Sequence, residues 1–250
     1  SGSYEVQHLG KTIRSMVDQL HKLMDDIVAE QESKRKSELD ALQSQINPHF
    51  LYNTLDSIIW MVENERYDGA VTMVTALARL FRISLSKGKN IISVADELEH
   101  VRNYLTIQKM RYKNKFVYEI DAEPETLHYA TIKLIVQPLV ENAIYHGMEF
   151  MGGDGEIRIH AYQKENSLYI DIIDNGLGMP QEQADALLTE TRVRGKGSGI
   201  GLKNVQERIQ LYFGSDYGLA IYSEPDEGTT ARIHLPLKTL EELDKGGDGK

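Results

Sequence analysis

Apolar residues near the start of the chain recur in alternating steps of three and four, which is the spacing of a coiled-coil seam. The residues of this seam are Val6, Leu9, Ile13, Met16, Leu20, Leu23 and Ile27. Residues 30–38 then contain no apolar side chain, and Leu39, Leu42 and Ile46 resume in a different phase. The pattern predicts a long N-terminal helix that pairs with a second helix; the alternative is a helix packed on its own domain.

The helical period continues over 39–63 and again over 70–86, on either side of a turn at 68–69. Pro48 interrupts the first segment, because proline cannot donate to the carbonyl four residues back and kinks the helix axis. A short turn makes successive helices antiparallel neighbours. The sequence therefore predicts a helical hairpin, followed by a further helix over 94–112.

Beyond residue 114, short stretches alternate apolar and polar side chains, as strands with one buried face do. Strands are predicted over 116–120, 156–163, 168–173, 219–223 and 230–235. Apolar stretches over 129–146 and 197–213 favour helices. This order predicts an α+β protein, in which a coiled-coil and helical-hairpin region precedes an α/β sandwich with helices on one face of a sheet.

Composition removes several classes of function. Hydrophobic residues make up 41% of the 250 residues, enough for sizeable cores. The net charge of −10 argues against a nucleic-acid partner, which normally meets a basic surface. Cysteine is absent and the eight histidines show no paired zinc motif, so disulfides, thiolate sites and zinc sites are disfavoured. No apolar run approaches the roughly 20 residues that cross a bilayer, and this piece is expected to be soluble.

A carboxylate and two glycines follow the strand predicted over 168–173. Asp174 ends that strand, and Gly176 and Gly178 come directly after it. Glycines let the backbone approach a flat ligand, and a carboxylate accepts hydrogen bonds from it. Adenine offers an amino group to such an acid, whereas guanine presents an oxygen. By themselves, the same residues also describe a simple Asx turn.

A second glycine-rich segment, Gly195–Leu202, opens the helix predicted over 197–213. Closely spaced glycines before a helix present backbone N–H groups to phosphate. The spacing fits neither a dinucleotide-binding fingerprint nor a Walker loop. Arg192, Arg194 and Lys196 make this segment basic within an acidic chain, which favours a phosphate ligand.

Two polar residues, Glu141 and Asn142, interrupt the apolar stretch over 137–147. Buried polar groups require partners, and an asparagine oxygen suits Mg²⁺, which keeps several waters and bridges nucleotide phosphates. His146 stands beside Gly147 at the end of this stretch. It is expected either to contact phosphate or to cap the helix C-terminus, and the residues alone leave both open.

A fourth motif lies around Pro48. On a helix, Gln45, His49, Asn53 and Asp56 fall on one stripe, about one turn apart. A neutral imidazole is a competent nucleophile near pH 7, because its ordinary pKa is about 6.5. A lone histidine on a helix is more often a packed structural residue. This motif therefore indicates catalysis only in combination with the other three motifs.

Together and in this order, the four motifs resemble those of bacterial sensor histidine kinases of the LytS/YesM group. The segment Ile46-Asn47-Pro48-His49-Phe50-Leu51-Tyr52-Asn53 resembles their phosphoacceptor motif. The later motifs are similar to the Bergerat-type (GHKL) ATPase module shared with gyrase, the MutL mismatch-repair protein and the ninety-kilodalton heat-shock chaperone. The resemblance covers roughly 39–238, and residues 5–24 also resemble the second helix of a HAMP linker.

The resemblance implies four segments. These are a signalling helix ending a HAMP-like linker over 1–32, dimerisation and phosphotransfer helices over 33–114, a catalytic ATP-binding domain over 115–239 and a disordered tail over 240–250. It implies a homodimer that passes phosphate to a response regulator. It also implies that this piece is the cytoplasmic portion of a bacterial membrane-anchored protein with an upstream sensor region.

The resemblance also implies residue roles, with ATP and Mg²⁺ as cofactors. His49 would be the phosphoacceptor and Asn53 would orient it. Asn142 would bind Mg²⁺, while Asp174 would bind the adenine amino group with help from Thr229 through water. Further ATP contacts are implied for Glu141, His146, Gly176, Gly178, Lys196, Gly197, Ser198, Gly199, Ile200, Gly201 and Leu202.

Three positions depart from the family pattern. Pro138 stands where hydrolytic relatives carry the water-activating glutamate, which disfavours an ATPase motor. Tyr145 replaces a basic residue, so His146 or Lys196 is expected to take over the phosphate contact. Phe50 follows the phosphoacceptor where other kinases have an acid, so the sequence identifies no proton acceptor. The leading hypothesis is a histidine autokinase; the alternative is a nucleotide-binding module that regulates a partner without phosphorylating itself.

Overall fold

The structure, a computed structural model, describes residues 48–84, 90–148, 152–189 and 198–245. By its internal contacts the chain divides into two units, 1–52 and 53–250. The first unit is described over 48–52, which belong to helix α2 (Pro48–Glu63). The predicted seam and signalling helix over 1–32, the predicted helix before Pro48 with its kink, and residues 246–250 lie outside the described residues.

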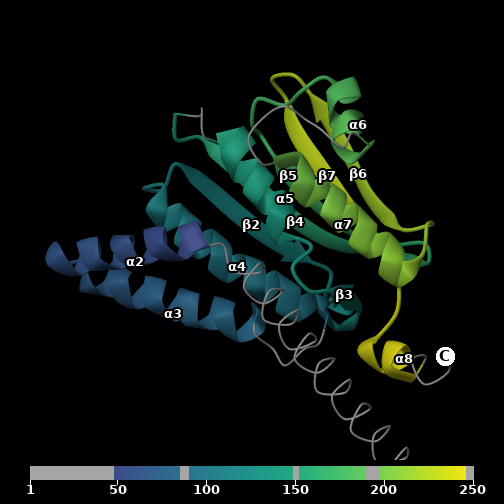
Figure 1. The fold of residues 1–250 in the computed structure, drawn as a ribbon, viewed down its shortest axis with the longest axis horizontal. Helices are drawn as coiled ribbons and strands as arrows, with labels where there is room; N and C mark the ends of the chain where they lie inside the picture. The colour runs from purple at the N-terminus through teal and green to yellow at the C-terminus, as the bar shows by residue number, and fades with distance from the viewer. Residues whose placement is uncertain (1–47, 85–89, 149–151, 190–197, 246–250) are drawn as a thin grey trace, which may run out of the picture. The chain divides into compact units, whose positions relative to one another are not determined.

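Helix α3 (Tyr67–Ser84) follows α2 after a three-residue turn, so the predicted hairpin is present (Figure 1). The turn predicted at 68–69 is wrong, because the turn lies at 64–66 and residues 68–69 belong to the first turn of α3. Glu65 in the turn has a φ of 59° and Arg66 N–H donates to Met61 at 2.8 Å, which closes the end of α2. A side chain at Gly69 would lie 3.3 Å from the sulfur of Met61, so the two helices approach closely beside the turn. The buried face of α3 packs on α4.

Helix α4 (Val94–Arg111) matches the helix predicted over 94–112. Ser93 caps its first turn, because its hydroxyl accepts from Asp96 N–H at 3.1 Å. The helix contacts α3 on one side and α5 and β2 on another. It therefore contacts elements on both sides of the boundary predicted between 33–114 and 115–239, and the division into domains stays a prediction.

The main sheet has the strand order β2-β4-β5-β7-β6 (Figure 1). Its strands are β2 (Phe116–Ala122), β4 (Gly155–Lys164), β5 (Ser167–Asp174), β7 (Gly228–Pro236) and β6 (Gly218–Glu224). β2 runs parallel to β4, and the other neighbours are antiparallel. All five predicted strands are thus confirmed.

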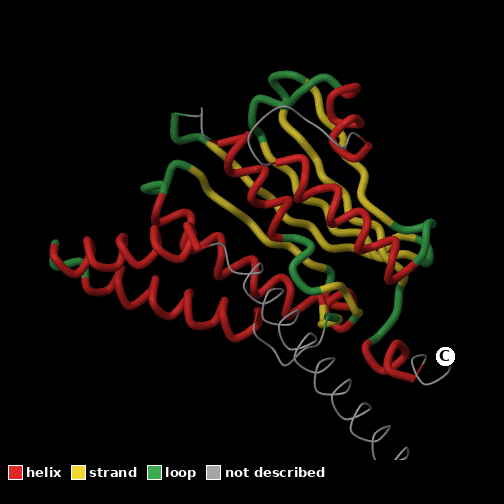
Figure 2. The backbone as a smooth tube through the Cα atoms, in the orientation of Figure 1, coloured by secondary structure: helices red, strands yellow, loops and turns green. Residues whose placement is uncertain are grey.

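Helices cover one face of this sheet (Figure 2). Alternate residues such as Ile159, Ile170 and Ile233 are fully buried, and they form the core with α5 (Gln137–Asn142) and α7 (Ser198–Phe213). This arrangement confirms the predicted α/β sandwich, and the helix predicted over 197–213 is α7.

The single helix predicted over 129–146 is wrong. Residues Ala130–Ile132 form strand β3, which pairs with β1 (Ile91–Ser93) in a separate two-stranded sheet. Leu134 then adopts a left-handed φ of 61°, and α5 is followed by a π-helix, η2 (Ala143–Met148). A continuous apolar run does not distinguish a buried strand from a buried helix, and here it contains both.

Three short helices were not predicted. They are the 3₁₀ helix η1 (Pro124–His128), α6 (Gln181–Thr189) and α8 (Leu240–Lys245). Helix α8 corrects the disordered tail predicted over 240–250 for residues 240–245, and the rest of that tail lies outside the described residues. Thr239 and Glu242 form a reciprocal capping box, with N–H to side-chain distances of 2.7 and 3.3 Å. Among the described helices, none combines the length and apolar character that a bilayer span requires.

Candidate functional site

Asp174 is the last residue of β5, on the same face as the buried Ile170 and Ile172. Its side chain is 8% exposed, and its carboxylate accepts the Gly176 N–H at 2.9 Å and the Thr229 N–H. Burial raises the pKa of Asp174 to about 6, and the two backbone hydrogen bonds offset only part of that rise. The strand end thus holds a desolvated carboxylate that is still an acceptor near neutral pH.

Two glycines bring the turns around this carboxylate into contact. Gly178 and Gly228 have φ angles of 61° and 107°, which side-chain-bearing residues rarely adopt. A Cβ at Gly178 would overlap the carbonyl oxygen of Glu224, and one at Gly228 would overlap that of Asp174. Both positions therefore require glycine for the backbone to close around Asp174.

Thr229 lies directly opposite Asp174 in the β5–β7 register. Its hydroxyl is 2.8 Å from that of Ser223, which donates to the Gly228 carbonyl at 3.0 Å and accepts from Met179 N–H at 2.9 Å. Ser223 therefore links the three chain segments that meet beside Asp174.

A cavity of about 310 Å³ opens beside these residues. It is lined by Ile173, Asp174, Gln181, Tyr222, Ser223, Glu224, Glu227, Gly228, Thr229 and Thr230. A larger cavity of about 1000 Å³ lies between α2, α3 and the end of α4, and none of the predicted site residues lines it. The smaller cavity is therefore the one that belongs to the predicted site.

Asn142 ends α5 and is half-buried. Its Nδ2 atom is buried and has no hydrogen-bond partner among the described residues. A buried amide normally has a partner, so this side chain suits a polar ligand. The described residues contain no group of three or more acidic or histidine side chains able to hold a metal ion. A single amide oxygen fits Mg²⁺, which binds proteins through few groups and keeps waters and phosphates as its other ligands.

Glu141, beside Asn142, is held by protein side chains. Its carboxylate accepts from Gln137 at 2.8 Å and hydrogen-bonds the Tyr104 hydroxyl. Burial raises its pKa, although these hydrogen bonds oppose the rise. Its implied contact with ATP stays a prediction.

The glycine-rich segment is described from Ser198 onward. Ser198, Gly199, Ile200, Gly201 and Leu202 form the first turns of α7. A Cβ at Gly201 would lie 3.7 Å from that of Pro138, so the starts of α7 and α5 are neighbours. Lys196 and Gly197 lie outside the described residues, as does the side chain of His146.

His49 lies on α2 with an exposed side chain. Asn53 follows one turn later and is half-buried, and its carbonyl accepts from the Ser57 hydroxyl at 2.7 Å. Phe50, the neighbour of His49, is 8% exposed. The histidine thus faces solvent while the adjacent aromatic ring is buried.

Two family profiles match the chain, one over the segment with His49 and one over the segment with Asn142 and Asp174. The profile of the histidine kinase family matches residues 37–116, and that of the histidine kinase-, DNA gyrase B- and HSP90-like ATPases matches residues 128–239. The chain belongs to the sensor histidine kinases. The family recognised from the four motifs is therefore confirmed.

Individual relatives agree with this assignment. The chain is 38% identical over 234 residues to the sensor histidine kinase YesM of Bacillus subtilis, covering 94% of this chain and 39% of the relative. It is 32% identical to the sensor histidine kinase BtsS of Escherichia coli K12, covering 92% and 39%. It is also 32% identical to the sensor protein LytS of Bacillus anthracis, covering 86% and 37%. The chain thus spans less than two fifths of each of these relatives.

The sequence did not indicate two residues that help to build the site around Asp174, namely Ser223 and Gln181. The Gln181 side chain accepts from Ser223 N–H at 3.0 Å and donates to the Ile221 carbonyl at 2.8 Å, which ties α6 to β6. These partners lie about 40 residues apart in the sequence, so no local spacing indicates them.

Proposed function

We propose that this chain is the catalytic portion of a two-component sensor histidine kinase, which phosphorylates His49 from ATP and transfers the phosphoryl group to a response-regulator aspartate. The observation that carries the proposal is the buried Asp174 carboxylate, enclosed by turns that require glycine, within a segment matched by an ATPase family. The exposed His49 within the segment matched by histidine kinases supports it.

In this proposal, Asp174 accepts a hydrogen bond from the adenine amino group, and Thr229 holds a bridging water. Gly176 presents its N–H to the carboxylate and so keeps the acceptor oriented. Asn142 would offer its amide oxygen to Mg²⁺, and its buried Nδ2 has no hydrogen-bond partner among the described residues. Mg²⁺, when bound, would neutralise the negative charge that develops on the phosphates during transfer.

The chemistry at His49 is a nucleophilic displacement. An unprotonated ring nitrogen forms a bond to the γ-phosphorus while the bond from that phosphorus to the β–γ bridging oxygen breaks, and ADP leaves. The ring then loses the proton on its other nitrogen to solvent or a base. Asn53, one turn away, is proposed to orient the ring. A second displacement by a regulator aspartate would return His49 to its free form.

The same proposal includes a homodimer formed through the hairpin. Leu55, Ile59, Val62, Val71 and Val74 on α2 and α3 are 41–65% exposed, which leaves an apolar stripe in contact with water. A second copy would bury it. Sedimentation should show a dimer, and Val71→Glu should weaken it while Thr72→Glu, at the neighbouring exposed position, should not.

We propose further that the whole protein is anchored in a bacterial membrane with this portion in the cytoplasm. The resemblance of residues 5–24 to a HAMP helix supports this placement. The identity of the relatives as sensor proteins is in keeping with it. Fractionation of the full-length protein would check it.

Labelling with γ-labelled ATP tests the kinase activity. The protein should acquire acid-labile, alkali-stable label in the presence of Mg²⁺, and His49→Ala should abolish it. His128→Ala, which changes another exposed histidine, should label normally. Label that persists in His49→Ala would contradict the assignment. Tight ATP binding without labelled histidine would instead favour a nucleotide-binding regulatory module, because the residue beside His49 is a buried phenylalanine rather than an acid.

A further inference from the structure

One face of helix α4 carries polar side chains that are completely buried. Glu97 and His100 are 0% exposed and Tyr104 is 1% exposed. Their spacing of three and four residues places them on one stripe of the helix. Most buried polar groups have partners, so the partners of this stripe show what it holds, although the Nδ1 atom of His100 has no hydrogen-bond partner among the described residues.

The partners of Glu97 are the backbone groups that lead into α5. Its two carboxylate oxygens accept the N–H groups of Leu134 at 2.8 Å, Ile135 at 3.0 Å and Val136 at 2.9 Å. The N–H groups at the start of a helix have no partner within that helix. Here Glu97, on another helix, accepts the N–H of Val136, the N-cap residue of α5. The carboxylate also holds Leu134 in its left-handed conformation.

His100 and Tyr104 continue this contact along α5. The Nε2 atom of His100 donates to Gln137 at 2.7 Å, and the amide of Gln137 donates to Glu141 at 2.8 Å. The hydroxyl of Tyr104 hydrogen-bonds the Glu141 carboxylate and accepts from the Gln108 amide at 2.6 Å. The polar stripe of α4 therefore holds α5 from its start to the residue before Asn142.

The same junction receives contacts from two other helices. Arg208 of α7 donates to the carbonyl oxygens of Lys133 at 2.6 Å and Leu134 at 3.3 Å. The ammonium group of Lys133 donates to the Ser84 carbonyl at the end of α3, at 2.9 Å. The segment before α5 is thus fixed by α3, α4 and α7 together.

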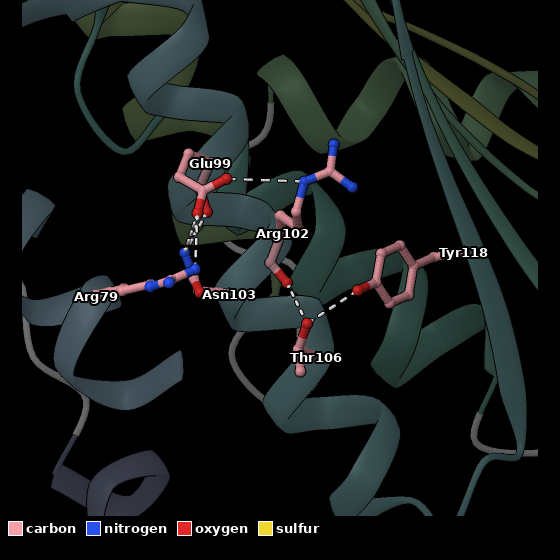
Figure 3. A network of polar contacts seen from close by, with 6 residues as sticks. All are labelled: Arg79, Glu99, Arg102, Asn103, Thr106 and Tyr118. Atoms are coloured by element: carbon pink, nitrogen blue, oxygen red, sulfur yellow. Dashed lines mark hydrogen bonds and ion pairs between the residues drawn. The ribbon is translucent and has the colours of Figure 1, made fainter. Parts of the chain in front are cut away.

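The opposite side of α4 provides a contrast (Figure 3). Glu99 is 41% exposed and lies 3.9 Å from Arg79 and 3.8 Å from Arg102. Thr106 meets Tyr118 of β2 at 2.9 Å. The contacts drawn there join α4 to α3 and β2 and do not involve α5, so Glu99 is a matched control for Glu97.

We propose that Glu97, with His100 and Tyr104, positions Asn142 for the Mg²⁺-bound nucleotide by fixing both ends of α5. These three are positioning residues, because they touch α5 and its preceding turn rather than the ligand. The inference rests on the proposed function, in which Asn142 is the Mg²⁺ ligand. It makes the affinity for Mg²⁺–ATP depend on helix α4, which also packs on the hairpin.

The test measures the dissociation constant of a fluorescent ATP analogue on the full chain, with Mg²⁺ and with EDTA. Glu97→Gln should weaken Mg²⁺-dependent binding roughly tenfold, as loss of a buried charged hydrogen-bond acceptor does. Binding in EDTA should change less than about twofold, because the contacts at Asp174 remain. Glu99→Gln should match the unchanged protein in both conditions. Equal losses with and without Mg²⁺ would overturn the proposal.

A double variant separates the positioning role of Glu97 from the proposed role of Asn142 as Mg²⁺ ligand. Asn142→Ala should lose the Mg²⁺-dependent gain in affinity, and adding Glu97→Gln should weaken binding no further. If Asn142→Ala keeps the full gain, the assignment of Asn142 as Mg²⁺ ligand fails. If Asn142→Ala loses it while Glu97→Gln alone keeps it, or if the two losses add, the positioning role alone fails.

Tyr104→Phe keeps the test decisive if Glu97→Gln does not fold. It removes one hydroxyl and preserves the buried ring, so a cooperative thermal transition should remain. We expect a roughly threefold loss of Mg²⁺-dependent affinity, with binding in EDTA unchanged. A folded Tyr104→Phe protein with unchanged Mg²⁺-dependent binding would overturn the proposal.

Discussion

The two ends of the candidate nucleotide site are held in different ways. Around Asp174, the partners are backbone groups of Gly176 and Thr229 and a closely packed turn at Gly228, all belonging to the sheet and its turns. Asn142 instead ends a six-residue helix whose start is held by Glu97 on α4. Strand register thus fixes the proposed adenine end around Asp174, whereas a separate helix fixes the proposed metal end at Asn142.

This difference has a consequence for regulation. The sheet joins β5 and β7 along their whole length, so Asp174 and Thr229 keep their relation while the sheet is folded. Helix α4 lies between the hairpin and α5, so a displacement of α4 would reach Asn142 first.

The largest effect is expected from Gly228→Ala, which places a Cβ against the Asp174 carbonyl at a φ of 107°. The free energy of unfolding should fall by more than about 2 kcal/mol, because neither the backbone nor the neighbouring turn has room to adjust. Urea denaturation measures the change. Gly152→Ala, where an added Cβ meets nothing within 4 Å, should stay within about 0.5 kcal/mol. Similar stabilities for the two variants would show that the turns are not closely packed.

Asp174→Asn should have opposite effects on stability and binding. The pKa of Asp174 is raised to about 6 from an ordinary value of 3.8. Between pH values of about 4 and 6 the native state therefore holds a proton that the unfolded state has lost, and this group's contribution to stability declines as pH rises through that range. Removing the buried charge should raise the free energy of unfolding at pH 7 by roughly 2 to 3 kcal/mol.

The same variant should bind ATP at least about tenfold more weakly, because the charged acceptor proposed for the adenine amino group is gone. Calorimetric melting and nucleotide titration on one preparation measure both quantities. A variant that is destabilised at pH 7, or that binds ATP normally, would contradict the role given to Asp174.

ATP affinity should also depend on pH through the same group. With a pKa of about 6, Asp174 is mostly ionised at pH 7 and mostly protonated at pH 5. Affinity should therefore fall about tenfold between these two pH values. Asp174→Asn serves as the control and should show a clearly flatter profile. Equal slopes in both proteins would assign the pH dependence to another group.

The sequence predicts the Asp174 end of the site better than the Asn142 end. Asp174 and Gly178 lie in one strand and the turn after it, so their pattern is local and was predictable. Thr229 lies on β7, and only the family resemblance implied that it belongs beside Asp174. The partners of α5 were not, because Glu97 is 37 to 39 residues from the N–H groups it accepts. Periodicity also gave one helix over 129–146, since an apolar run does not reveal the left-handed break at Leu134.

Helix α8 shows a local signal that was overlooked. The capping pair Thr239 and Glu242 marks a helix start, but the charged and glycine-rich residues after it suggested only a tail. Glu141 shows the reverse case. The family pattern implies an ATP contact, whereas the structure shows its carboxylate bound by Gln137 and Tyr104 of the protein.

The smallest effect is expected on the outer side of α4. Arg79→Ala removes an ion pair at 3.9 Å between two side chains that are 57% and 41% exposed. Exposed pairs of this kind contribute little, so the free energy of unfolding should change by less than about 0.5 kcal/mol. Nucleotide affinity should be unchanged with and without Mg²⁺. A loss of Mg²⁺-dependent binding would mean that α4 acts through its outer side as well.

Mapping the phosphorylated residue tests whether His49 is the phosphoacceptor. The protein is incubated with ATP and Mg²⁺, digested under alkaline conditions that preserve phosphohistidine, and analysed by mass spectrometry. We expect one added phosphoryl group on the peptide that contains His49, and its absence when Mg²⁺ is chelated. A phosphoryl group on any other residue, or none after prolonged incubation with bound ATP, would contradict it.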